Sequence, residues 1–112
     1  MPTQRPKDVV DAFLNDMRAA IQAGRYAFIP RRKNLQTLAA HGLLLEDVLD
    51  ELMHLTFANY ISGPETDRDR PSSDPFWIFK SSIEGERIYI KVKVEYQTDK
   101  GVKIVSFHMD EC

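Results

Sequence analysis

The stretch that decides the fold is RIYIKVKVE, residues 87–95, in which polar and apolar side chains alternate without a break. Successive side chains of a β-strand point to opposite faces of the sheet, so this alternation predicts a strand with one buried face and one solvated face. The buried face is expected to carry Ile88, Ile90, Val92, Val94 and Tyr96, and the solvated face Arg87, Tyr89, Lys91, Lys93 and Glu95.

The segments on either side of this strand also have β character. Residues 76–80, FWIFK, are rich in aromatic side chains, and Glu84-Gly85 marks a turn before the alternating strand. A second turn, Asp99-Lys100-Gly101, leads into a last strand over residues 102–108. The last third of the chain is therefore predicted to be a three-stranded antiparallel meander, with Trp77 in the core.

The first half of the chain has helical periodicity. Apolar residues recur at spacings of three and four from Val9 to Ile21, which predicts a helix of about 18 residues. Asn34 is expected to cap a short second helix, and a third helix is expected to begin at Leu45. Residues 26–29 form an edge strand or an extended link. The prediction is an α+β fold, one domain over residues 1–112, with N-terminal helices packed on a small antiparallel sheet of three or four strands.

Composition restricts the class of protein. Fifteen Lys and Arg against seventeen Asp and Glu give a net charge of −2, so no basic field covers the whole chain. The one cysteine, Cys112, excludes a disulfide framework and a cysteine-rich zinc site. The absence of a long apolar run argues against a spanning helix or a secretory signal, so we expect a cytoplasmic protein. With no glycine-rich phosphate loop and no nucleophile elbow, no cofactor is expected.

The solvated face of the alternating strand is the best candidate for chemistry. Side chains on a strand are held more rigidly than those on a loop, which suits a site that positions a phosphodiester. Lys91 and its neighbours would stabilise negative charge on phosphorus, and Tyr89 would bond a phosphate or stack on a base. The same pattern also fits a solvated face on which lysines prevent aggregation.

His108 ends the last predicted strand. If that strand pairs with the alternating one, the imidazole can reach the same face and act as a general acid or base near neutral pH. A histidine at a strand end can equally have no catalytic role.

The stretch SGPETDRDRPSSDP, residues 62–75, is predicted to be a long polar loop. Its arginines, Arg68 and Arg70, either pair with the acids of the loop or face a phosphate or a protein partner. Asp67 and Asp69, together with His108, would form a metal site, but no spacing matches a known calcium loop and the interleaved arginines disfavour a cation there. No metal is expected.

Two stretches resemble one protein family. The run QAGRYAFIPRRKNLQTLAAHGLLLEDVLDELMHLTFANY, residues 22–60, resembles the central part of MqsR-type toxins, and WIFKSSIEGERIYIKVKVEY with VKIVSFH resembles their C-terminal hairpin. The resemblance covers roughly residues 20–108. It implies a fold similar to RelE-like ribonucleases and metal-independent cleavage of single-stranded mRNA, free or ribosome-bound, by the RNA's own 2′-hydroxyl. It also implies neutralisation by a cognate antitoxin protein.

The resemblance also implies site residues. Tyr89 and Lys91 match the family's strand tyrosine and the lysine two positions later, and His108 matches a basic residue after the last strand. Ile61-Ser62 and Ile78 replace a family lysine and glutamine, and Arg68, Arg70 or Lys80 would supply the missing cation. The expected catalytic residues are Tyr89, Lys91 and His108, and the expected RNA-binding residues are Lys93, Arg68, Arg70, Lys80 and Arg87. The alternative is a non-catalytic interaction or regulatory module on the same scaffold.

Overall fold

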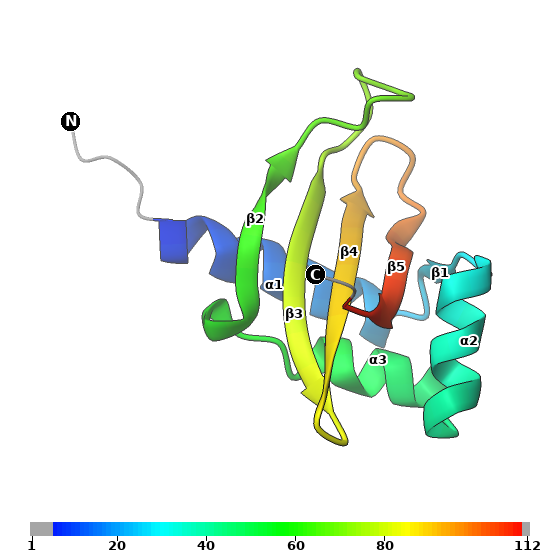
Figure 1. Ribbon diagram of the computed structural model, residues 1–112. Helices are drawn as coiled ribbons and strands as arrows, with labels where there is room; N and C mark the ends of the chain where they lie inside the picture. Colours follow the sequence, from blue (N-terminus) through cyan, green and yellow to red (C-terminus); the bar gives the residue numbers. More distant parts are fainter. Residues whose placement is uncertain (1–5, 111–112) are drawn as a thin grey trace.

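The alternating stretch lies in β4 (Glu86–Glu95), the central strand of a five-stranded sheet in the computed structural model, which describes residues 6–110 (Figure 1). Its predicted faces are largely confirmed, because Ile88, Ile90 and Val92 are fully buried and Val94 is nearly so. Tyr96 is the exception: it follows the end of the strand and is 55% exposed.

The other elements have the following bounds: α1 Pro6–Gln22, β1 Tyr26–Phe28, α2 Arg32–His41, α3 Leu45–Met53, a short 3₁₀ helix Phe57–Asn59, β2 Tyr60–Glu65, β3 Phe76–Ile83 and β5 Gly101–Met109. The three helices and the C-terminal meander β3–β4–β5 match the predicted order of elements.

The α+β class is confirmed, but the prediction of a three- or four-stranded antiparallel sheet is wrong. The sheet has five strands in the order β1-β5-β4-β3-β2, and β1 pairs with β5 in parallel. The parallel pair joins Tyr26 to Val102, residues far apart in the chain, and a three-residue strand has too little pattern to indicate such a partner.

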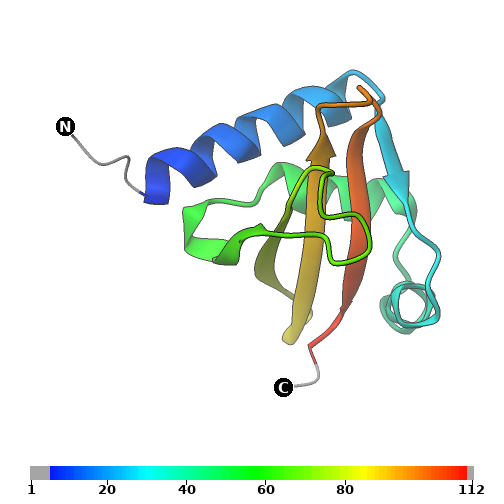
Figure 2. The ribbon, with the colours of Figure 1, turned by 90° about the horizontal axis from the view of Figure 1, so that it is seen from above.

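The fifth strand, β2, occupies the start of the region expected to be a loop. Ser62, Gly63 and Pro64 are weak strand formers, and they are tolerated because β2 is an edge strand. Its pairing with β3 is irregular, with register shifts on both sides of Ser62. The loop itself therefore spans residues 66–75, and Figure 2 shows it in front of the sheet.

The core lies between the sheet and two of the helices. Helices α1 and α3 lie behind the strands in Figure 1, and α2 lies beside the β1–β5 edge. The apolar side of β4 packs with side chains of α1 and α3, and Phe13 stacks on Trp77 with ring centroids 4.7 Å apart. Trp77 is a core residue, as predicted. The opposite side of the sheet, called the outer face below, carries no helix in the described chain.

The predicted role of Asn34 as a helix cap is wrong. The helix begins at Arg32, and Asn34 lies inside it, fully buried. The Asn34 amide nitrogen donates to the carbonyl oxygens of Ile29 (2.9 Å) and Val105 (3.0 Å), and its oxygen accepts from the Phe107 backbone N–H (3.0 Å). Past the end of β1, this side chain satisfies backbone groups that β5 would otherwise leave unpaired.

Candidate active site on the outer face of the sheet

Tyr89 and His108 are direct neighbours on the outer face. They are partners in the antiparallel pairing of β4 with β5, and their rings stack with centroids 5.4 Å apart at an angle of 22°. Both side chains are half-buried. A phenol and an imidazole held this way lie within reach of one bound group.

A β-bulge in β5 puts His108 on this face. Lys91 pairs with Ser106 but Val92 pairs with Ile104, so Val105 is an extra residue in β5. Side chains alternate along a strand, and an unbroken β5 would place Lys103 and His108 on opposite faces. Because of the extra residue, Lys103 and His108 both point to the outer face. Asn34 fixes the bulge through its hydrogen bonds to the backbone of Val105 and Phe107.

The hydrogen bond of His108 defines its tautomer. Its Nδ1 lies 3.0 Å from the backbone carbonyl oxygen of Met109. A carbonyl oxygen only accepts hydrogen bonds, so the Nδ1 of a bonded neutral imidazole carries the proton and Nε2 carries the lone pair. The imidazole is thus arranged to accept a proton at Nε2.

The surroundings of Tyr89 keep its phenol neutral. Burial raises the pKa of Tyr89 because it disfavours the phenolate, and the negative charge of Glu65 raises this pKa further. The ammonium of Lys80 acts in the opposite sense, and Asp110 adds to the increase. At neutral pH the Tyr89 hydroxyl is therefore a hydrogen-bond donor and not a base.

Two predicted RNA-binding cations, Lys80 and Arg87, lie next to this pair but share a carboxylate. Lys80 is the partner of Tyr89 on β3, and its Nζ lies 2.7 Å from Oδ2 of Asp110. The Arg87 Nε lies 3.9 Å from the same oxygen. Sequence reasoning missed Asp110, because an acid just after a strand carries no signal of the cations it will meet.

Lys91 and Lys93 have different surroundings, although they occupy equivalent positions in the alternating sequence pattern. Both ammonium groups lie over the Phe76 ring, at 4.7 Å and 4.3 Å from its centroid. Lys93 is only 3% exposed, and its Nζ contacts Asp67 Oδ2 (3.0 Å) and Ser73 Oγ (3.2 Å). In this structure Lys93 does not face solvent, because the 66–75 loop covers it, whereas Lys91 is half-exposed.

Asp67 anchors that loop. Its carboxylate bonds Lys93 and also accepts from the backbone N–H groups of Asp69 (3.0 Å) and Arg70 (3.2 Å). The bond to the Lys93 ammonium is the main reason that the pKa of Asp67 lies below its ordinary value, against the opposing effect of burial. Arg68 and Arg70 are exposed, and neither forms an ion pair within residues 6–110.

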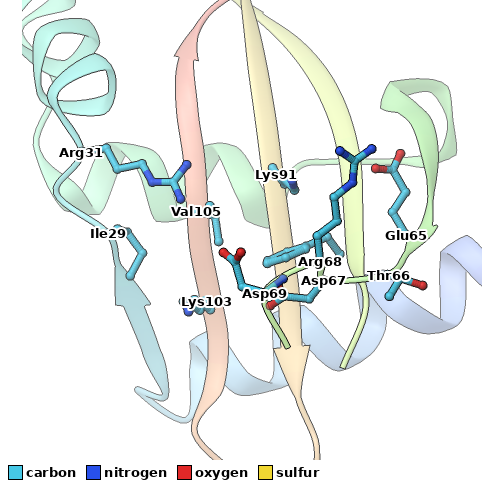
Figure 3. Close-up of a pocket in the computed structure, with 11 residues that line it drawn as sticks. Ile29, Arg31, Glu65, Thr66, Asp67, Arg68, Asp69, Lys91, Lys103 and Val105 are labelled. Carbon is cyan, nitrogen blue, oxygen red and sulfur yellow. The ribbon is translucent and has the colours of Figure 1, made fainter. Parts of the chain in front are cut away.

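A cavity of about 460 Å³ opens between this loop and the outer face, beside Lys91 (Figure 3). It is called the cation cavity below, because it is lined by Arg31, Arg68, Lys91 and Lys103; the other lining residues are Ile29, Glu65, Thr66, Asp67, Asp69, Phe76 and Val105. Sequence reasoning did not assign Arg31 or Lys103 to a site. The run Arg31-Arg32-Lys33, a block of three basic residues in the sequence, was the available signal for Arg31, and Lys103 had none.

Among the described residues, no cluster of donor side chains supports the alternative of a metal site. Residues 6–110 contain no group of three or more His, Cys, Asp or Glu side chains placed to hold a metal ion. Asp67 is bonded to Lys93, and the His108 ring stacks on Tyr89. Over the same described residues, no helix is long and apolar enough to cross a membrane.

Comparison with known proteins adds no relative. No protein-family model matches the chain, and a search of curated proteins gives no significant match.

Proposed function

We propose that this protein is a metal-independent endoribonuclease, a divergent MqsR-like toxin with a RelE-like fold, that cleaves single-stranded RNA. The observation that carries the proposal is the stacked pair of Tyr89 and His108 on a sheet face that no helix of residues 6–110 covers, with Lys91 two residues along the same strand. A proton acceptor, a neutral donor and a cation on one surface are the groups that transfer of a phosphoryl group to a 2′-hydroxyl requires.

The reaction uses the RNA's own 2′-hydroxyl as nucleophile. His108 Nε2 takes the proton from that hydroxyl while a bond forms from O2′ to the adjacent phosphorus. The bond from phosphorus to O5′ breaks, and the leaving oxygen takes a proton from water. The hydroxide that remains takes the proton from the His108 imidazolium, which restores the neutral base. The products are a 2′,3′-cyclic phosphate and a 5′-hydroxyl, so atoms and charge balance without a metal or cofactor.

Tyr89 and Lys91 stabilise the charge that develops on phosphorus. The neutral phenol donates to a non-bridging phosphate oxygen, and the Lys91 ammonium supplies positive charge beside it. Lys80 contributes less, because Asp110 already compensates its charge. Because each group is fixed on a strand of the sheet, little reorganisation accompanies the reaction.

The proposal includes a setting and a partner. An mRNA-cleaving toxin acts in the cytoplasm, on free or ribosome-bound mRNA, and a small cognate antitoxin protein neutralises it. These expectations follow from the resemblance to MqsR-type toxins, and co-purification with a product of the neighbouring reading frame tests the second one.

The direct test is cleavage of synthetic single-stranded RNA in the presence of EDTA. We expect the wild type to cleave and Tyr89→Phe plus Lys91→Ala to lower the rate by about 100-fold or more, because both sources of charge stabilisation are lost. Arg32→Ala, an exposed cation on α2 outside the site, is the matched control and should cleave normally. Undiminished cleavage in the double variant would refute the site. An inactive, harmless wild type that co-purifies with a second small protein would favour the interaction-module alternative.

A further inference from the structure

The four cations of the cation cavity are brought together from distant parts of the chain. Arg31 precedes α2, Arg68 lies on the 66–75 loop, and Lys91 and Lys103 come from β4 and β5. None of the four forms an ion pair within residues 6–110, in contrast to Lys80 and Lys93. Positive charges gathered around a concave surface without carboxylate partners favour an anionic ligand.

The carboxylates of the cavity do not cancel this charge. Asp67 is bonded to Lys93, and Glu65 Oε2 accepts a hydrogen bond from the Ser62 hydroxyl at 2.5 Å. The serine hydroxyl is neutral, so Glu65 and Asp69 both keep their charge, and four cations of the lining face two carboxylates that no cation pairs with in residues 6–110. The cavity therefore keeps an excess of positive charge, and Glu65 and Asp69 are the groups that would oppose an anion there.

The position of the cavity relates it to the proposed reaction. Lys91 lies two residues from Tyr89 along β4, a step of about 7 Å, and Lys103 pairs with Lys93 one further step of the same size away. Successive phosphates of an extended RNA strand are separated by a comparable distance. A strand with its reacting phosphate at Tyr89 and His108 can therefore place the next phosphate beside Lys91 and the following one beside Lys103, both in the cavity.

We propose, on the basis of the proposed function, that the cation cavity binds the backbone phosphates adjoining the reacting one in a single RNA strand, with Arg31 and Lys103 as its main ligands. The Arg31 guanidinium can bind a phosphate through two parallel hydrogen bonds. The Lys103 ammonium, on β5, adds a point charge to the same cavity. The apolar side chains of Ile29, Phe76 and Val105 line the same cavity beside the sugar and base. The substrate class is thus an RNA of several nucleotides, read by its backbone.

The experiment measures binding separately from cleavage. The probe is a fluorescent 2′-O-methyl hexauridylate, which has no free 2′-hydroxyl to attack, and its affinity is measured by fluorescence anisotropy at several salt concentrations. We expect Arg31→Gln and Lys103→Gln each to weaken binding about fivefold and to reduce the slope of log K against log salt by about 0.7. Arg32→Gln, one residue away but outside the cavity, should bind like the wild type, and Asp69→Asn should bind more tightly.

The outcomes separate the two proposals. If Arg31→Gln and Lys103→Gln bind the probe as Arg32→Gln does, with unchanged salt slopes, the cavity is not an RNA site. If both variants lose affinity for a polyglutamate peptide but not for the probe, the cavity docks an acidic protein segment and the inference is overturned. If the variants weaken probe binding while the wild type leaves unmodified RNA intact, the cavity is an RNA-binding site and the proposed ribonuclease function is wrong.

Discussion

The amide nitrogen of Asn34, on α2, lies 3.0 Å from the carbonyl oxygen of Val105, the extra residue of the β5 bulge. The oxygen of the same side chain accepts a hydrogen bond from the backbone N–H of Phe107, two residues further along β5. A helix side chain thus fixes the bulge that turns His108 toward Tyr89. The proposed site depends on this long-range contact as much as on the residues that would touch RNA.

Replacing Asn34 should destabilise the protein. In Asn34→Ala, the carbonyl oxygen of Val105 and the N–H of Phe107 lose their buried side-chain partner, whereas the Ile29 carbonyl oxygen keeps the N–H of Arg31 at 2.8 Å. We therefore expect a loss of about 3 kcal/mol in the free energy of unfolding. Urea denaturation measures this loss, and Gln36→Ala, on the exposed side of the same helix, is the control. A loss no greater than that of the control would show that the bulge does not need Asn34.

Sequence alone predicted the parts of the fold that local patterns specify. The alternation in β4 correctly placed Ile88, Ile90 and Val92 in the core, and the spacing from Val9 to Ile21 correctly predicted α1. Both patterns depend only on neighbours in the chain. The same alternation placed Tyr89 and Lys91 on the side away from the helices.

What the sequence did not predict depends on contacts between distant segments. The parallel pairing of β1 with β5, the bulge at Val105 and the role of Asn34 all join residues more than 70 positions apart or break the regular alternation. Lys93 has the same pattern as Lys91, and only the folded loop with Asp67 distinguishes them. Pattern reasoning therefore located the outer face but not the cation cavity.

The bond between Asp67 and Lys93 should make stability depend on acid pH. The folded pKa of Asp67 lies below its ordinary value of about 3.9, so the carboxylate stabilises the fold fully above that value. This stabilisation is lost as pH falls through the lowered folded pKa. We expect the wild type to lose more stability than Asp67→Asn between about pH 5 and pH 2, measured by thermal unfolding. Parallel pH curves for the two proteins would contradict the assignment.

Tyr89 should have the opposite dependence at alkaline pH. Its pKa is raised by burial and by Glu65, so the neutral phenol stabilises the fold below the ordinary value of about 10. That contribution is lost as pH rises through the raised folded pKa, because the unfolded chain ionises first. Tyr89→Phe should therefore lose less stability than the wild type above about pH 10 in denaturant titrations. An equal loss in both proteins would mean that the phenol is not desolvated.

Removing the carboxylate of Asp110 should strengthen RNA binding. Asp110 compensates Lys80, which pairs with Tyr89 on the next strand. In Asp110→Asn the Lys80 ammonium is free to contact a phosphate, and we expect about a threefold gain in affinity at low salt that decreases as salt is added. Anisotropy with the 2′-O-methyl probe measures it. Unchanged or weaker binding would show that Lys80 lies outside the path of the RNA.

His108 is proposed to activate the RNA's own 2′-hydroxyl, and the chemical form of the cleaved end is the decisive test of this role. RNA and its 2′-deoxy counterpart are incubated with the protein in EDTA, and the product ends are determined by mass spectrometry. We expect a 2′,3′-cyclic phosphate from RNA, no cleavage of the 2′-deoxy strand, and a loss of activity of about 100-fold or more in His108→Gln with normal folding. Cleavage of the 2′-deoxy strand, or full activity in His108→Gln, would contradict it.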